Sequence, residues 1–169
     1  MNKLHKLLFL AILTAFSLII YILEAQIPIF ISIPGVKLGL SNVITLVALL
    51  LFSVRESLVI LLLRCFLGAV LSGQLAALPY SLIGGVLSLI VMAMLRNHFS
   101  QNQIFILSVI GAVFHNFGQI LTAAVITETK NIFLYFPVLL LSGIITGMFT
   151  GFVVQYLLRY LKKIQKKAC

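Results

Sequence analysis

The sequence is poor in charge, and above all in negative charge. Its 169 residues include no Asp, no Trp and only three acidic side chains, against 12 Lys and Arg. Charged residues make up 9% of the chain and hydrophobic residues 62%, whereas soluble domains are about half apolar. Without Asp, the chain has neither an Asp-rich motif to hold Mg²⁺ against a diphosphate nor a Ser/His/Asp triad. The composition therefore predicts an integral membrane protein without catalytic residues.

Other absences narrow the function classes further. The two cysteines, Cys65 and Cys169, are far apart and form no CxxC pair, so neither a disulfide nor a metal site is predicted. There is no Walker A motif, and therefore no ATP hydrolysis by that route. No cofactor is expected. The basic residues lie in short segments between apolar stretches, where they set membrane orientation, so nucleic acid is not an expected partner.

The apolar stretches predict an all-α integral membrane protein with six transmembrane helices in one domain over residues 1–169. A bilayer core needs about 20 apolar helical residues. The second and third spans are short, and the last is long enough to tilt or to extend past the membrane. Breaks are expected at Pro34-Gly35 and Arg55-Glu56, among others. The predicted spans are 7–25, 39–54, 57–73, 79–95, 104–126 and 134–158.

The charge distribution predicts that both termini are cytoplasmic. Six spans put both ends on one side of the membrane, and most Lys and Arg residues fall on that side. Only Lys37 and Lys130 fall on the other. We therefore expect a multi-pass protein of the cytoplasmic membrane. The basic segment 159–167 is either a topology anchor or a surface that also contacts anionic lipid.

Arg64 lies midway along the apolar stretch 57–71. A guanidinium near the middle of a membrane span costs about 3 kcal/mol on insertion scales and ~10 kcal/mol or more in isolated-helix estimates. We therefore expect Arg64 to face a protein interior or a wet cavity. Such a cation suits a ligand with a carboxylate or phosphate, which guanidinium binds in bidentate fashion. The alternative is a structural ion pair between Arg64 and Glu24, without a ligand.

A second polar group lies in the fifth predicted helix. His115 and Gln119 are one turn apart on one face, and Asn116 lies about 100° to one side. Burial against lipid would cost several kcal/mol each, so these side chains should point into the bundle. Helical rise places them, Arg64, Glu24 and Asn42 in a polar column in the outer half of the membrane. Lys37 is expected at its mouth. Interhelical hydrogen bonds that hold the bundle together are the alternative for His115, Asn116 and Gln119.

Two further stretches are candidate functional segments. The segment 26–39 contains Pro28 and Pro34 and is mostly apolar, which predicts either a lid over a cavity or a hairpin dipping into the headgroups. In the first helix, Ala11 and Ala15 form a small-xxx-small pair, for packing either within this protein or against a partner. The glycines and serines of the fourth helix, and the GxxxG ridge of the sixth (Gly143, Gly147 and Gly151), predict close helix packing.

Four segments together resemble the Gx transporter family, also labelled heptaprenyl diphosphate synthase component I. They are Ile33-Pro34-Gly35-Val36-Lys37-Leu38-Gly39-Leu40-Ser41-Asn42-Val43-Ile44-Thr45-Leu46; Leu63-Arg64 with Gly68 and Gly73; Ser81-Leu82-Ile83-Gly84-Gly85-Val86-Leu87-Ser88; and His115-Asn116-Phe117-Gly118-Gln119. The resemblance covers nearly the whole chain.

That family is in turn similar to the substrate-binding S-components of energy-coupling factor (ECF) transporters. This similarity implies a six-helix bundle with a first-loop lid, and an AxxxA docking pattern that Ala11 and Ala15 match. It also implies a coupling subunit and two ATPases as partners. The resemblance and the residues together predict a membrane subunit that binds an anionic small molecule for import, with Arg64, His115, Asn116, Gln119, Asn42, Glu24 and Lys37 as site residues.

A second function remains open beside import. The synthase label implies a non-catalytic membrane partner in heptaprenyl diphosphate or quinone biosynthesis, since the chain has no Asp for elongation chemistry. The family's link to flavin or quinone electron-transfer systems is a third, weaker alternative. Neither label names a substrate.

Overall fold

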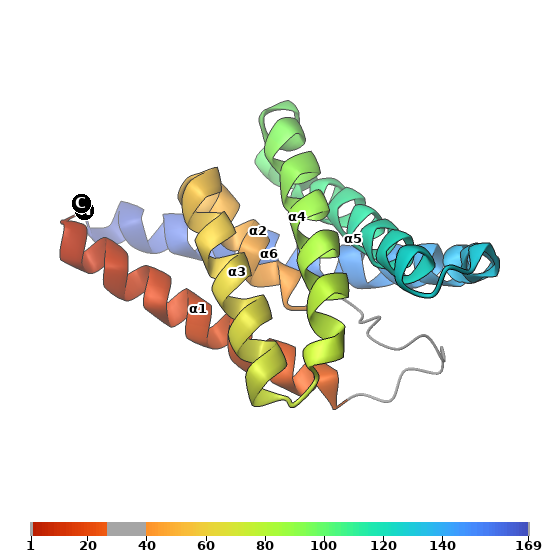
Figure 1. The fold of residues 1–169 in the computed structure, drawn as a ribbon. Helices are drawn as coiled ribbons and strands as arrows, with labels where there is room; N and C mark the ends of the chain where they lie inside the picture. The colour runs from red at the N-terminus through yellow and green to blue at the C-terminus, as the bar shows by residue number, and fades with distance from the viewer. Residues whose placement is uncertain (1, 27–39, 169) are drawn as a thin grey trace.

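The computed structural model describes residues 2–26 and 40–168, and every regular element in that part of the chain is helical (Figure 1). This confirms the predicted helical class. The described residues form six α-helices and four short 3₁₀ helices, which lie in the last three connections: η1 (Leu75–Ala77), η2 (Arg96–His98), η3 (Gln101–Gln103) and η4 (Lys130–Tyr135). The α-helices are α1 (Lys3–Ala25), α2 (Asn42–Leu51), α3 (Val54–Leu71), α4 (Leu78–Leu95), α5 (Ile104–Ile126) and α6 (Phe136–Ala168).

Four segments are long and apolar enough to cross a membrane: Lys3–Glu24, Leu75–His98, Gln101–Ile126 and Lys130–Tyr160. The six predicted spans are therefore found as six helices, of which four have the length and composition of a span. The fifth prediction, 104–126, coincides with α5. Helix α6 has 33 residues and rises about 50 Å at 1.5 Å per residue, so it exceeds a bilayer core as expected.

The predicted boundary between the second and third helices was wrong. The second span was expected over 39–54 with a break at Arg55-Glu56, but α2 ends at Leu51 and α3 begins at Val54. A capping box sets this boundary: Ser53 is the N-cap of α3, and the Glu56 side chain accepts from the Ser53 backbone N–H at 3.1 Å. This satisfies a backbone donor that the helix start leaves open. Arg55 and Glu56 thus lie in the first turn of α3.

Side-chain contacts at one end of the bundle show that consecutive helices alternate in direction. Lys6 at the start of α1 pairs with Glu56 at the start of α3. Arg96, which follows α4, donates to the Leu49 carbonyl near the end of α2 at 3.2 Å. Near the end of α6, Arg159 donates to Asn102, just before α5, at 2.8 Å. The start of α1 and the end of α6 also lie at one side of the view in Figure 1. The side of the membrane they face stays a prediction.

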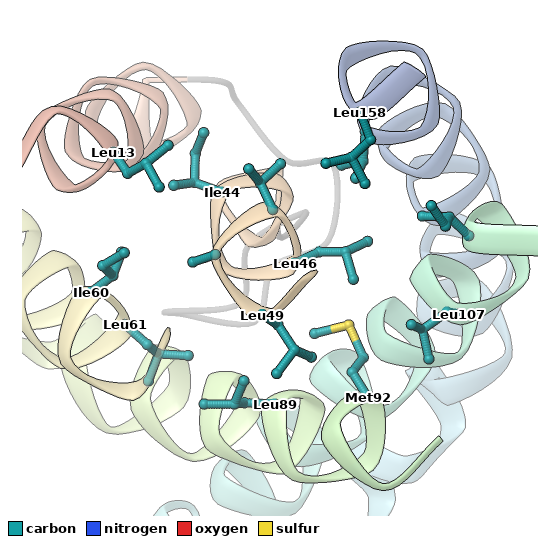
Figure 2. Close-up of a cluster of buried hydrophobic side chains, with 14 of the residues drawn as sticks. Leu13, Ile44, Leu46, Leu49, Ile60, Leu61, Leu89, Met92, Leu107 and Leu158 are labelled. Atoms are coloured by element: carbon teal, nitrogen blue, oxygen red, sulfur yellow. The ribbon is translucent and has the colours of Figure 1, made fainter. Parts of the chain in front are cut away.

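The short helix α2 lies in the centre of the hydrophobic core. All six residues from Ile44 to Leu49 are buried, so every face of this stretch is covered. Figure 2 shows Leu46 and Leu49 of α2 surrounded by labelled side chains from the other five helices: Leu13, Ile60, Leu61, Leu89, Met92, Leu107 and Leu158. A helix that is hydrophobic all round belongs in a core, which explains why α2 lacks a polar face.

The GxxxG ridge of α6 packs closely on α5; close helix packing was predicted, and the structure identifies the neighbour. A Cβ added at Gly147 would lie 2.7 Å from the Val109 Cα, and one at Gly151 would lie 2.5 Å from the Phe105 Cα. Both atoms are backbone, so neither contact is relieved by a side-chain rotation. Ser108 of α5 and Thr150 of α6 share a hydrogen bond of 2.8 Å at the same crossing. Glycine is therefore required for this approach of the two helices.

Candidate functional site

Arg64 is buried in the bundle, 1% exposed, and its guanidinium is only partly satisfied. Its Nη2 donates to the Asn42 Oδ1 at 3.1 Å, joining α3 to the first residue of α2. Among the residues that the structure describes, its Nε and Nη1 have no hydrogen-bond partner. Burying charged donors without partners is costly. The arrangement therefore favours an acceptor supplied by something else.

Glu24 does not supply that acceptor by direct pairing. Its buried carboxylate accepts from the Ser41 backbone N–H at 3.3 Å, at the N-cap of α2. The ion pair found in the described part of the chain joins Lys6 to Glu56 instead. The sequence left a direct Arg64–Glu24 pair as an alternative, and the structure gives Arg64 an amide partner in its place. Both groups nevertheless lie within electrostatic range of Tyr21.

Tyr21 connects α1 to this cluster. Its hydroxyl lies 3.3 Å from the Ser81 Oγ of α4. Its ring lies on Gly68 of α3, where an added Cβ would fall 2.4 Å from the Tyr21 Cδ1. Sequence reasoning missed Tyr21 and Ser81. Tyr21 precedes Glu24 by three residues, on the same helix face, and this spacing was the signal that could have found it.

The α4 glycines let polar groups approach from two neighbouring helices. A Cβ added at Gly84 would lie 3.1 Å from the Gln119 Cγ and 3.2 Å from the His115 Nδ1, both on α5. One added at Gly85 would lie 3.5 Å from the Arg64 Nη2 on α3. His115 also lies within electrostatic range of Arg64. The structure therefore places Arg64, Asn42, His115 and Gln119 around one stretch of α4.

Asn116 lies apart from that cluster. Its Nδ2 donates to the Leu139 carbonyl of α6 at 2.6 Å. A Cβ added at Gly143, also on α6, would lie 2.8 Å from the same Nδ2. Asn116 therefore connects α5 to α6, which is the interhelical role that the sequence left open. Lys37 and most of the expected lid, residues 27–39, lie outside the described residues.

Ala11 and Ala15 are exposed and line a groove of about 470 Å³ between α1 and α3. Neither alanine is therefore used to pack α1 against the rest of the described chain. The small side chains would let a partner helix approach α1 closely at this groove.

The Lys6–Glu56 ion pair lies at the end of this groove and joins α1 to α3. Sequence reasoning did not predict this pair. The Glu56 carboxylate also contacts the Ser53 side chain within the capping box. The hydrogen bond from Lys6 is the main cause that lowers the pKa of Glu56 below its ordinary value of 4.5. The signal for Glu56 was the Ser-x-x-Glu spacing of residues 53–56.

The cluster combines one cation with polar side chains from neighbouring helices. In the described part of the chain, no three His, Cys, Asp or Glu side chains gather in a way that could hold a metal ion. Arg64 provides charged donors, and Asn42, His115 and Gln119 add polar groups around it. This combination suits an anionic group, which guanidinium recognises through paired hydrogen bonds.

A model of the protein family described as heptaprenyl diphosphate synthase component I matches residues 13–157. The match covers α2–α5 and most of α1 and α6, and so includes every residue of the Arg64 cluster. No curated protein matches the chain. No solved structure matches it either.

Proposed function

The chain belongs to the heptaprenyl diphosphate synthase component I family, and from this membership we propose that it is a non-catalytic membrane component of such a synthase. A separate, soluble protein would carry out chain elongation, and this chain would position it at the cytoplasmic membrane. The family match over residues 13–157 is the observation that carries the proposal. The name "component I" itself implies a second protein.

The acidic residues support a non-catalytic role. Prenyl elongation requires carboxylates that hold Mg²⁺ against a diphosphate, and this chain has only three. Glu24 accepts from the α2 N-terminus, and Glu56 pairs with Lys6 inside a capping box. Glu128 is exposed in the turn after α5. The three lie on different elements and two of them have structural partners.

Co-purification tests this proposal. The tagged chain is expressed in its native membrane, solubilised gently and analysed for bound proteins by mass spectrometry. We expect a soluble prenyltransferase with Asp-rich motifs at near-stoichiometric amounts, absent from a control purification of an unrelated tagged membrane protein. Recovery of a coupling subunit with two ATPases, without any prenyltransferase, would contradict the synthase role.

A second candidate is an S-component-like carrier that captures an anionic small molecule for import. The observation that favours it is the partly satisfied Arg64 guanidinium, buried beside the first residue of α2. The N-terminal end of α2 already holds the Glu24 carboxylate. The Arg64 donors that lack a partner among the described residues therefore carry this candidate. Ala11 and Ala15 would then dock the coupling subunit.

Ligand analysis separates this candidate from a purely structural Arg64. Small molecules carried by the gently purified protein are identified by mass spectrometry for the wild type, Arg64→Ala and Arg96→Gln. The carrier predicts an anionic molecule that disappears in Arg64→Ala. Arg96→Gln is the matched control, because among the described residues the Arg96 side chain donates to the Leu49 carbonyl and to no residue of the Arg64 cluster. An unchanged ligand content in Arg64→Ala would remove the anion-binding role.

A further inference from the structure

The groove between α1 and α3 is a second candidate site, distinct from the Arg64 cluster. It consists of two adjoining parts of about 470 Å³ each, which share Leu7, Leu10, Glu56 and Val59. From Lys3 to Leu18 on α1 it extends over 15 helical steps, which is about 22 Å at the helical rise of 1.5 Å. The groove is thus long and shallow, so it suits an extended chain better than a compact molecule.

One end of the groove is strongly basic. Lys3, Lys6 and Arg55 line it together with a single carboxylate, Glu56. Three cations and one anion leave a net charge of +2. Lys6 is paired with Glu56, but within the described residues neither Lys3 nor Arg55 forms an ion pair. Two cations at this end therefore lack a counter-ion.

The remainder of the groove is apolar. Its walls are formed by leucines, valine, isoleucine and alanines of α1 and α3, and the one hydroxyl belongs to Thr14. The Thr14 Oγ1 donates to the Leu10 carbonyl at 2.8 Å, within its own helix. The hydroxyl is thereby satisfied without a ligand. An occupant needs a hydrocarbon tail here and a negative head at the basic end.

We propose that this groove binds a long-chain isoprenoid diphosphate, with the diphosphate at Lys3, Lys6 and Arg55 and the chain along α1 and α3. The assignment rests on the proposed synthase role. Charge decides between amphiphiles: a terminal diphosphate carries more negative charge than the single phosphate of phosphatidylglycerol, and so matches the two unpaired cations better. The basic end lies at the start of α1, on the predicted cytoplasmic side of the membrane. A soluble synthase would release its product on that side.

Native mass spectrometry of the purified full-length chain tests the assignment, with heptaprenyl diphosphate as the probe. Heptaprenol, which lacks the diphosphate, tests whether the head is needed. Inorganic diphosphate tests whether the tail is needed. Phosphatidylglycerol tests whether an ordinary anionic lipid binds equally well. We expect heptaprenyl diphosphate to bind most tightly. Arg55→Gln should weaken binding about fivefold, the effect of one cation near a membrane surface. Ala11→Phe, which fills the groove, should weaken it by about tenfold.

Matched variants control for fold and for nonspecific charge. Lys130→Gln removes an exposed cation in η4, and Ile145→Phe enlarges an exposed side chain on α6. Both should bind the probe like the wild type. Equal affinity for phosphatidylglycerol and heptaprenyl diphosphate would overturn the assignment and mark a lipid site. So would unchanged probe binding in both Arg55→Gln and Ala11→Phe.

The partner experiment keeps the two proposals separable. If a prenyltransferase co-purifies but heptaprenyl diphosphate does not bind, the synthase role stands and the groove assignment fails. If the probe binds in the groove and no prenyltransferase co-purifies, the groove assignment stands and the synthase role fails. If Ala11→Phe removes a co-purifying protein and leaves probe binding intact, the groove holds a partner helix, and the assignment is overturned.

Discussion

The free-energy cost of burying Arg64 was enough to predict where this side chain lies. The expense of a guanidinium in an apolar span predicted that it would be enclosed by protein, and it is 1% exposed. The same reasoning could not choose its partner. Glu24 offered the stronger electrostatic attraction, but its carboxylate contacts the Ser41 N–H at the start of α2. Arg64 contacts the neutral Asn42 instead.

Replacing Arg64 and its partner Asn42 together by apolar residues should stabilise the protein. The double variant Arg64→Met/Asn42→Leu removes two charged donors that lack partners among the described residues, and it also removes the Asn42 Oδ1 that Arg64→Met alone would leave without its donor. Replacing a buried charged pair by apolar residues is neutral to stabilising, by about 1–4 kcal/mol. Thermal unfolding in detergent measures the change. Arg64→Met alone is the control and should be less stable than the double variant, because Asn42 loses its partner. A lower melting temperature for the double variant than for the wild type would indicate that the charge has a partner that stabilises the fold.

The Lys6–Glu56 pair should make stability depend on pH in the acid range. The Glu56 pKa is lowered in the folded protein below its ordinary 4.5, so folding favours the ionised form. This contribution is present above the ordinary pKa and is lost as pH falls through the lowered value. The wild type should therefore exceed Glu56→Gln in melting temperature at neutral pH, and the difference should vanish in acid. Glu128→Gln, at an exposed turn after α5, is the matched control.

Asn116 marks the limit of residue-level prediction. Its polarity predicted that it would point into the bundle, and it is buried. Its position about 100° from His115 meant that it would face another neighbour. Which neighbour depends on how α5 and α6 are arranged, and spacing within one helix does not contain that information. The structure directs it to the Leu139 carbonyl of α6.

At the scale of helices, the apolar pattern found α5 to the residue but misplaced the α2–α3 boundary. The apolar stretch continues through Leu50, Leu51 and Phe52, so counting apolar residues extends the second span too far. The capping box at Ser53 and Glu56 is a local polar signal that overrides it. The Ser-x-x-Glu spacing of residues 53–56 is a capping-box pattern, and it predicts the start of α3 correctly.

The α5–α6 crossing should tolerate no side chain at Gly151. A Cβ there would lie 2.5 Å from the Phe105 Cα and 2.9 Å from the Ser108 Cβ. Gly151→Val should therefore separate the helices and cost about 1–3 kcal/mol or more, as overpacking does. Thermal unfolding in detergent measures it. Ile145→Val on the exposed face of α6 is the control and should change little. Wild-type stability in Gly151→Val would show that the two helices are not held this closely.

At the scale of the whole molecule, the number of helices was predictable and their arrangement was not. Length and hydropathy are properties of each segment, so six helices followed from the sequence. Which helix is central depends on contacts between segments far apart in the chain. The sequence predicted that the second helix is short. The structure adds that residues Ile44 to Leu49 of α2 are buried on every face (Figure 2).

The central position of α2 makes its side chains sensitive to truncation. Leu46 is 1% exposed and belongs to the core that all six helices build. Leu46→Ala should cost about 2–5 kcal/mol, the usual effect of a fully buried leucine. Leu141→Ala, on the exposed face of α6, removes the same atoms and should cost far less. Equal melting temperatures for the two variants would contradict a core centred on α2.

The length of α2 also bears on how the chain enters the membrane during synthesis. Ten helical residues rise about 15 Å, half of a hydrocarbon core of ~30 Å. The insertion machinery therefore meets a segment that is too short to be retained alone. We expect α2 to partition into lipid only together with α3, as a hairpin in which the Arg64 Nη2 already donates to the Asn42 Oδ1.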